Sequence, residues 1–413
     1  MTATISSAST IAALRVRYKD GIDKEDFDRA PVLYKMVPRA TDFDGLSYDF
    51  SLNTDGTQGL GVDIATAQAS LAQSPNYRFS ITRVRYYSVA RVTGETMKAA
   101  KGPGALLNLW EREVERSTYS INRDLAFQFH RSGTGARGQL LASGSGVASA
   151  TVTLEDDGSI NFFSVGMRVQ ASATDGSALV GSGDSVTISG MDRAARQLTT
   201  TGGNWSTQIA TLADGYFLYR TGDAANGGAN KCLTGVDTWI SSSAIFGLTR
   251  TGSDVVKLGG QTLSAAGIPL EELGPELATR LQQQGSLPPD LLVLNPDEGN
   301  KIRKALIARS SYNRIEVKSA VAGISFKGFE IDGPMGTITV LEDITRAKKT
   351  ALMTRKASWR MHSLGECPQI LDFDNNNMLR LADDDAYEIR TGMYGNVECF
   401  RPVDSIRCTN VGE

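Results

Sequence analysis

The sequence is poor in the side chains that most enzymes use for chemistry. Its 413 residues include two histidines, His130 and His362, and neither lies in an H-E-x-x-H pattern or near a nucleophile motif. Its four cysteines form no C-x-x-C pair, so neither a zinc knuckle nor a disulfide framework is indicated. No phosphate-binding P-loop, nucleophile elbow or kinase signature is present. The composition therefore argues against an enzyme and predicts no cofactor and no metal.

The sequence also lacks a basic excess and a long apolar run. Lysine and arginine total 43 against 46 acidic residues, whereas a nucleic-acid-binding domain normally carries an excess of basic residues. No apolar run approaches the roughly 18 residues of a membrane span. The first twenty residues lack the charged region and the sustained apolar core of a signal peptide. We therefore expect a protein that is made and matures in the cytoplasm, without a membrane partner.

One long helix is predicted in a chain whose 42 glycines indicate many turns and a β-rich fold. It begins at Gly102-Pro103-Gly104, because proline suits the first turn of a helix, and meets no further glycine or proline until Gly133. That is roughly 30 residues, against an average of about 11–12 for globular helices. The length indicates an architectural strut. One stripe of the helix is apolar and is predicted to face the core: Leu107, Trp110, Val114, Ile121, Leu125 and Phe129.

The segment before this helix predicts an arm and a hairpin. Residues 1–44 contain a short apolar patch and a charged stretch but no sustained heptad, so we expect an extended arm that needs a partner. The predicted apolar anchors of this arm are Ile11, Leu14, Phe27 and Leu33. Residues 46–50 and 78–92 alternate as strands do, and the polar, glycine-rich segment between them predicts a long β-hairpin. Three arginines of this hairpin, Arg78, Arg83 and Arg85, mark either a solvated face or a subunit contact.

After the helix the composition changes. Gly133 to Gly138 match G-x-G-x-x-G, but a dinucleotide fingerprint follows a strand and this one follows a helix, so we interpret it as a flexible hinge. Residues 139–220 are rich in Gly, Ser, Thr, Ala and Val. They contain five or six short strand-like runs separated by Asp-Gly turns, and no helix-period segment. This spacing predicts a small β-barrel or sandwich inserted into a host domain.

From residue 221 the pattern becomes mixed α/β. Leu270, Leu273, Leu277 and Leu281 form a helical stripe that stops at Gly285. Residues 290–295, DLLVLN, read as a buried strand, and Asn295-Pro296 then predicts an N-cap and a first helical position. Further strands are predicted near 315–317, 329–331 and 337–341, and the last 60 residues alternate again.

This order of elements resembles the major capsid proteins of tailed bacteriophages, which have the Hong Kong 97-like fold. Residues 85–115, RYYSVARVTGETMKAAKGPGALLNLWEREVE, resemble the end of the family's E-loop leading into its spine helix. DLLVLNPDEGNKIRKAL at 290–306 is similar to the strand–helix unit of its A-domain, and FEIDGPMGTITVLEDI at 329–344 to the strands that follow. YEIRTGMYGNVECFRPVDSI at 387–406 resembles the closing segment.

The resemblance implies an α+β protein with an inserted all-β domain. The implied division is an N-terminal arm at 1–44, an E-loop at 45–93, a P-domain spine helix at 94–138, the inserted β-domain at 139–220, an A-domain at 221–345, and returning P-domain strands with a C-terminal A-domain segment at 346–413.

The function implied by the resemblance is structural. Such a subunit self-assembles as hexamers and pentamers into the icosahedral head shell, which is put together in the host cytoplasm and encloses phage DNA. Its implied partners are further copies of itself, a scaffolding protein and a portal, with a cement protein left open. Contact with packaged double-stranded DNA is expected to be weak and non-specific, because strong affinity scales with basic residues. Two alternatives stand beside it: an encapsulin-like nanocompartment shell, and a β-rich binding or adhesion module of a phage tail.

Scaffolding by the chain's own N-terminus is not expected. Only about 44 residues precede the first hairpin strand, and Pro31 and Pro38 interrupt them, so no apolar heptad survives. We therefore expect a separate scaffolding protein, and residues 1–44 that remain on the mature subunit.

Overall fold

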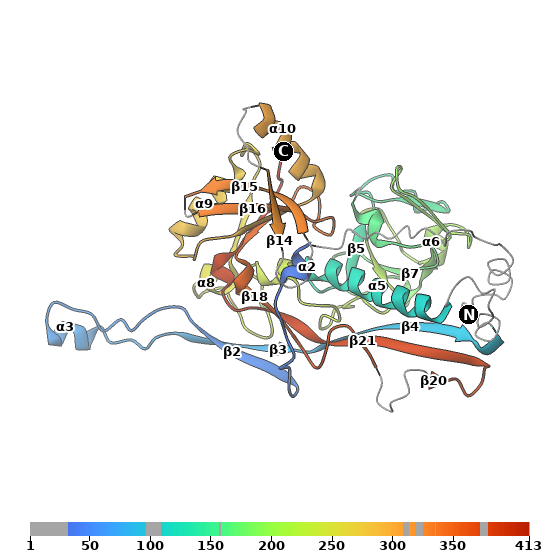
Figure 1. Ribbon diagram of the computed structural model, residues 1–413, viewed down its shortest axis with the longest axis horizontal. Helices are drawn as coiled ribbons and strands as arrows, with labels where there is room; N and C mark the ends of the chain where they lie inside the picture. The colour runs from blue at the N-terminus through green and yellow to red at the C-terminus, as the bar shows by residue number, and fades with distance from the viewer. Residues whose placement is uncertain are drawn as a thin grey trace.

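The computed structural model describes residues 32–95, 109–156, 158–308, 314–318, 325–334, 336–371 and 379–412. Figure 1 shows that the described part of the molecule consists of a lobe, a hairpin and a β-rich unit beside a long helix. A lobe containing α9, α10 and a large sheet lies above the centre, and a thin hairpin projects to the left. To the right, a long strand pair runs beneath helix α5, with a compact β-rich unit above it.

Helix α5 (Leu109–Phe129) is the strut of the fold. It is shorter than predicted at its C-terminal end, because His130 and Arg131 donate backbone hydrogen bonds three residues back, to Phe127 and Gln128, and the chain then turns. The predicted start at Gly102 and the predicted core residue Leu107 lie outside the described residues. Ile121, Leu125 and Phe129 are buried, at successive four-residue steps, as the predicted stripe requires.

The strut lies on one face of a long antiparallel pair. Strand β4 (Val84–Thr93) pairs with β21 (Ala386–Cys399) from Thr93 opposite Ala386 to Val84 opposite Gly395. Alternate residues of β4 are buried, as a sheet with one covered face requires. The same sheet includes four shorter strands: β1 (Arg39–Ala40), β18 (Trp359–Ser363), β19 (Gln369–Ile370) and β20 (Leu379–Arg380).

The hairpin consists of β2 (Ser47–Asn53) and β3 (Asn76–Thr82), and short helix α3 (Ile64–Ala69) lies in its tip. The single predicted second strand, residues 78–92, is in fact two strands. The break falls at Arg83, where the chain leaves the hairpin and enters the β4–β21 sheet. The residues after the break therefore belong to the body of the protein, because their hydrogen-bonding partner is β21 rather than β2.

The upper lobe is a mixed sheet covered on both faces. Its seven described strands run in the order β12 (Gln261–Ser264), β22 (Ile406–Thr409), β17 (Ala351–Thr354), β13 (Leu291–Leu294), β16 (Gly336–Glu342), β15 (Ser325–Gly333), β14 (Arg314–Lys318). In β13, Leu291 and Val293 face the central core, whereas Leu292 and Leu294 face a second core. A strand that reads as continuously apolar is expected when both faces are buried.

Two helices cover the outer face of this sheet. Helix α9 (Leu273–Gln283) buries Leu273, Leu277 and Leu281 against it, which are three of the four leucines of the predicted stripe. Helix α10 (Pro296–Ala308) begins at the predicted cap, where the Asn295 side chain accepts from the Asp297 amide at 3.2 Å. The short helices α7 (Val236–Trp239) and α8 (Val255–Gly259) pack beneath the sheet, in the central core.

Residues 136–220 form a unit with a hydrophobic core of its own, centred on Val152, Phe163, Leu198, Trp205 and Leu218. The described strands are β5 (Ala136–Gln139), β6 (Thr151–Thr153), β7 (Arg168–Ser172), β8 (Val186–Thr187), β9 (Gly190–Asp192), β10 (Gln197–Thr199) and β11 (Phe217–Arg220), in sheets ordered β6-β10-β9 and β5-β11-β7-β8. The unit also holds a short helix, α6 (Trp205–Gln208), which the sequence did not predict.

The end of the predicted arm belongs to the body of the protein. Helix α2 (Val32–Met36) and the residues after it lie in the central core, where Leu33 and Phe43 are fully buried. Leu33 is thus not available as an anchor on a neighbouring subunit, and that prediction is wrong. The apolar side chains of residues 33–37 are all buried within their own chain: Leu33, Tyr34, Met36 and Val37. Ile11, Leu14 and Phe27 lie outside the described residues.

Candidate functional site

The described residues offer little for catalysis. Among them, no group of three or more His, Cys, Asp or Glu side chains is placed to hold a metal ion. Within the same part of the chain, no helix combines the length and apolar character needed to cross a bilayer.

The four cysteines are buried and unreactive. Burial raises the pKa of all four thiols, that of Cys408 to about 12. A thiol acts as a nucleophile through its thiolate form, so these side chains remain protonated hydrophobic groups at neutral pH.

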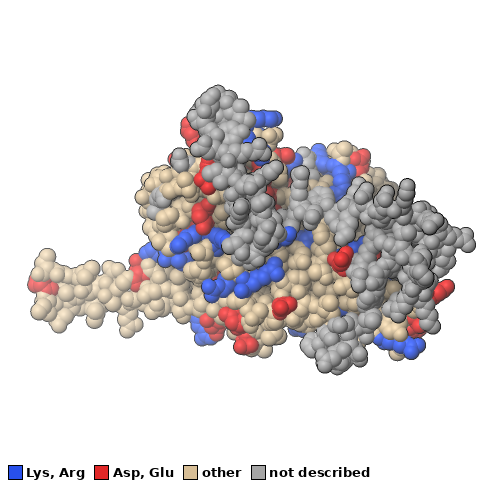
Figure 2. All heavy atoms as spheres, viewed as in Figure 1, with Lys and Arg blue, Asp and Glu red and all other residues tan. Residues whose placement is uncertain are grey.

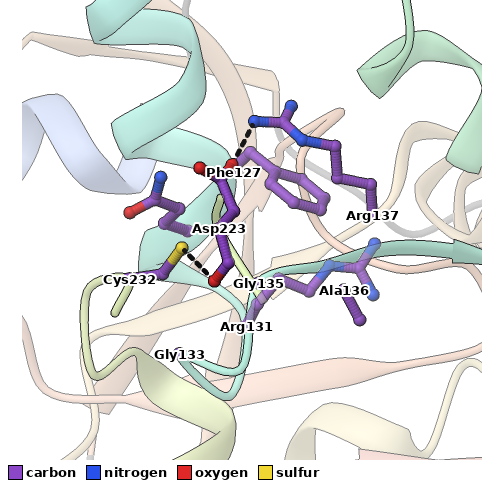
Figure 3. A pocket seen from close by; sticks show the side chains of 9 residues that line it. Phe127, Arg131, Gly133, Gly135, Ala136, Arg137, Asp223 and Cys232 are labelled. Atoms are coloured by element: carbon purple, nitrogen blue, oxygen red, sulfur yellow. Dashed lines mark hydrogen bonds and ion pairs between the residues drawn. The ribbon is translucent and has the colours of Figure 1, made fainter. Parts of the chain in front are cut away.

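One small cavity lies where α5 ends, between Phe127, Arg137, Asp223 and Cys232 (Figure 3). Its volume of about 10 Å³ is close to the space that one water molecule needs. It is therefore too small for a substrate or a nucleotide.

The G-x-G-x-x-G segment forms the wall of this cavity rather than a loose hinge. Gly133 and Gly135 have φ of +82° and +93°, a region that favours glycine. A Cβ on Gly135 would lie 2.5 Å from the carbonyl oxygen of Asp223. The glycines are needed because the chain passes this closely to residues 223–233, so the loop is tightly packed and the flexible-hinge interpretation is wrong.

A buried network of charges beside the cavity joins the strut to the β-rich unit. Asp124 of α5 accepts from both terminal nitrogens of Arg137 on β5, at 3.1 and 3.0 Å. It also accepts from Tyr86 of β4 at 2.9 Å and from Arg220 of β11. Arg137 contacts Asp223 as well, at 3.2 Å. Four elements that lie far apart in the sequence therefore meet at one carboxylate.

The charges of this network stabilise one another. Burial alone would raise the pKa of Asp124, but Arg137 and Arg220 hold it well below its ordinary value. Burial likewise opposes the charge of Arg137, and the carboxylate of Asp124 raises its pKa. The carboxylate and the guanidinium are thus both charged at neutral pH. A buried group of paired charges of this kind fixes how its elements meet.

A second buried group lies at the root of the hairpin. His362 of β18 is within 2.6 Å of Asp42 through Nδ1 and of Glu398 through Nε2. Its ring stacks on Tyr48 of β2, with ring centroids 4.1 Å apart. Burial alone would lower the pKa of His362, but the two carboxylates raise it above its ordinary value. The imidazole therefore joins the N-terminal segment, the hairpin and the long sheet.

The tip of the hairpin presents apolar side chains to solvent. Leu60, Val62, Ile64 and Leu71 are all more than 70% exposed, and Val62 is fully exposed. Figures 1 and 2 show the hairpin standing clear of the body of the molecule. A lone hairpin is at best marginally stable in water, and a cluster of exposed apolar side chains marks an interaction site. The tip is therefore the main candidate for contact with another molecule.

The other residues predicted for the strut and the hairpin differ in how far they are exposed. Val114 is only partly buried, and the side chain of Trp110 lies outside the described residues. Arg78 is exposed and paired with Asp49 on the neighbouring strand. Arg85 is exposed, whereas Arg83 lies over the ring of Phe43, 5.8 Å from its centroid.

Sequence reasoning missed the apolar tip, the Asp124 network and the His362 cluster. The apolar residues spaced through the otherwise polar segment 58–71, QGLGVDIATAQASL, were a signal for the tip. No signal in the sequence indicated the Asp124 network or the His362 cluster, because only the tertiary fold brings their members together.

Comparisons with known proteins show that this chain is similar in fold to solved structures with which it shares little sequence identity. No family model matches the chain, and no curated protein matches it. Among solved structures, it is similar to the capsid of cyanophage A-1(L), with a TM-score of 0.55 and 8% identity over 99% of this chain and 100% of that one. It is also similar to the SrpI encapsulin of Synechococcus elongatus, with a TM-score of 0.51 and 8% identity over 97% and 95%. The chain therefore has the Hong Kong 97-like fold that its sequence resembles.

Proposed function

We propose that this chain is a major capsid protein, which self-assembles as hexamers and pentamers into an icosahedral head shell around phage DNA. The observation that carries the proposal is the likeness of the whole chain to the whole of a phage capsid subunit. The role is structural, and the proposal assigns no catalytic residue and no cofactor.

The exposed hairpin tip supports a role in assembly. A subunit of a closed shell has to reach its neighbours, and a projecting hairpin with Leu60, Val62, Ile64 and Leu71 exposed becomes stable when a second copy covers these side chains. The formal charge of −3 fits a wall that contacts DNA weakly and non-specifically, since affinity for phosphates depends on basic residues.

A nanocompartment shell is the second candidate, because the fold is also similar to an encapsulin over nearly its whole length. Purified particles distinguish the two functions. A phage head filled in its host contains double-stranded DNA, whereas a nanocompartment contains protein cargo. A tail adhesion module has less support, since the shell fold extends over the whole chain.

In this proposal the β-rich unit is an insertion into the shell fold. Its separate core and its position after the strut support this, with the boundary moved from 139 to Ala136, because β5 begins there. Further partners are a scaffolding protein and a portal, with a cement protein on the outer surface left open. The site of action is the virion shell, and assembly takes place in the host cytoplasm.

Two experiments test the proposal. Expressed protein is expected to sediment as capsomers or particles that electron microscopy shows as closed shells, and a stable monomer that never assembles with scaffold and portal present would contradict it. The intact mass of the subunit from DNA-filled particles tests the arm. Retention of residues 1–44 is expected, and loss of the first few dozen residues would refute the separate scaffolding protein.

A further inference from the structure

His362 is held between two carboxylates at the point where the hairpin leaves the body of the protein. Its ring nitrogens Nδ1 and Nε2 each lie 2.6 Å from a carboxylate oxygen, the first from Asp42 and the second from Glu398. An ionised carboxylate only accepts hydrogen bonds, so both contacts are satisfied together when both ring nitrogens carry a proton. A neutral imidazole has one N–H group and one bare nitrogen, and it can keep only one of the two contacts.

The two carboxylates differ in their access to water. The side chains of His362 and Glu398 are 1% and 5% exposed, whereas that of Asp42 is 50% exposed. A buried carboxylate that loses its partner has no water to replace it, and leaving it unpaired is costly. Asp42 can instead turn into solvent. We therefore expect a neutral His362 to keep its proton on Nε2, facing Glu398, and to lose the contact between Nδ1 and Asp42.

The contact with Asp42 ties the first strand of the hairpin to the body. Asp42 lies between β1 and β2, next to Phe43, whose amide donates to the carbonyl of Ser363 at 3.3 Å. Tyr48 of β2 stacks on the imidazole ring, and a positive charge on that ring strengthens the stacking. Two contacts at the entry to β2 therefore depend on the charge of one side chain, His362.

The second strand of the hairpin is attached in a different way. Asn396 lies opposite His362 in the pairing of β18 with β21, and its Nδ2 donates to the carbonyl of Thr82, the last residue of β3, at 2.8 Å. An amide side chain does not titrate, so this hydrogen bond is the same at every pH. Loss of charge on His362 therefore affects the attachment of β2 and leaves that of β3 in place.

Few other ionisable side chains lie on the elements around the ring. Besides Asp42 and Glu398, the elements around the ring carry Arg39 of β1, Asp44 of the turn that follows it, Tyr48 of β2, Arg83 before β4 and Arg360 of β18. Burial raises the pKa of Tyr48, and Glu398 and Asp42 act in the same direction, so its hydroxyl stays neutral where an imidazole titrates. Arginine and carboxylate side chains ordinarily titrate far from neutral pH, whereas histidine changes its charge close to it. Among these side chains, His362 is therefore the one suited to respond to pH.

We propose that His362 is a proton-operated clamp on the root of the hairpin. With both ring nitrogens protonated, the side chain ties Asp42 at the entry to β2 to Glu398 of the long sheet. Loss of the Nδ1 proton to solvent frees Asp42, weakens the stacking on Tyr48 and loosens the start of β2. The clamp is a property of the single subunit, so its failure would leave the proposed function standing.

The two ring nitrogens provide a direct test, because the chain contains only two histidines. In the full-length subunit labelled with nitrogen-15 histidine, the contact with the ring of Tyr48 identifies His362, and NMR follows both of its nitrogens from about pH 5 to 9. We expect one titration in which Nδ1 loses its proton and Nε2 keeps it. Loss of the Nε2 proton instead, or no titration in this range, would overturn the proposal.

Asp42→Asn keeps the contact but removes its dependence on pH. An amide accepts from a protonated Nδ1 through its oxygen and donates to a bare Nδ1 through its nitrogen, so the contact persists in both states. The hydrogen-exchange protection factor of the Phe43 amide, which corrects for the intrinsic effect of pH, reports on the entry to β2. It is expected to fall roughly three- to tenfold in the wild type as the pH rises through the titration of His362, and less than about twofold in Asp42→Asn.

Two controls accompany this measurement. Asp44→Asn removes one carboxylate at an exposed position of the same turn and should retain the full fall in protection. The amides of β3 should show no such fall in any variant, because the attachment of β3 does not titrate. An unchanged protection factor of Phe43 in the wild type, or an equal fall in Asp42→Asn, would refute the clamp.

Discussion

Replacing Asp124 by asparagine tests whether the buried charge network holds the β-rich unit to the strut. The change keeps the volume of the side chain and removes its charge. Among the described residues, Arg137, whose side chain is 2% exposed, then keeps only Asp223 as a charged partner, and Arg220 and Tyr86 lose the carboxylate that they share.

The expected cost follows from burial. Breaking a buried ion pair by removing one partner destabilises a protein by about 3–5 kcal/mol, because the other charge stays buried without compensation. Asp124 is 4% exposed, so this range applies. Glu113→Gln on the same helix is the matched control. Its partner Arg116 is 60% exposed, and such a surface pair contributes about 0–1 kcal/mol.

The effect also has a defined pH dependence. Because the pKa of Asp124 is lower in the folded than in the unfolded chain, its contribution is fully present above the unfolded value of about 4. It is lost as the pH falls through the lower folded value. The difference in stability between wild type and Asp124→Asn should therefore be constant from about pH 5 to 8 and shrink below about pH 4.

Urea unfolding of dissociated subunits measures the change, and amide hydrogen exchange locates it. We expect faster exchange in β5 and β11, the strands that carry Arg137 and Arg220. A loss of stability no larger than that of Glu113→Gln, or an unchanged exchange rate in both strands, would refute the structural role assigned to the network.

Three further predictions concern the hairpin tip, the His362 cluster and the β-rich unit. Val62→Asp should leave the fold of the isolated subunit unchanged but prevent the formation of particles, which sedimentation measures. Gln58→Asp, at another exposed position of the tip, is the control and should assemble normally. Assembly of both variants would rule out the tip as a contact. The pKa of His362 in the folded protein, measured by NMR, should lie above 6.5. The stabilising contribution of this side chain is then fully present below pH 6.5 and is lost as the pH rises through the pKa of the folded state. A measured pKa below 6.5 would contradict the role assigned to the two carboxylates. Residues 136–220 expressed alone should give dispersed amide resonances, because their core is separate, and a collapsed spectrum would show that they depend on the rest of the chain.

Local patterns predicted many individual elements. Asn295-Pro296 identified the start of α10, because capping depends on adjacent residues alone. The steps between Ile121, Leu125 and Phe129 identified the buried face of the strut, because helical periodicity is a local property. The sequence of β13 likewise indicated a strand buried on both faces.

Pairing between distant segments was decided only by the tertiary structure. The alternation of residues 84–92 does not distinguish a partner in β2 from one in β21, about 300 residues away. The break at Arg83 and the role of β4 in the body were therefore missed. Leu33 was misjudged for a related reason: apolar character shows that a side chain will be buried, but not whether its own chain or a neighbour buries it.

The buried polar clusters show most clearly which features depend on the tertiary structure and not on the local sequence. Each carboxylate, arginine and histidine of these clusters is ordinary in its local sequence. Asp124 becomes a paired buried charge because β4, β5 and β11 converge on α5, and Arg346 and Arg407 share Asp237 because α7, β22 and the turn after β16 converge. The sequence by itself determined several of the main helices and strands, such as the strut, β13 and the start of α10, since these depend on neighbouring residues. Only the tertiary structure decided which charges meet, because charge pairing depends on distance in space.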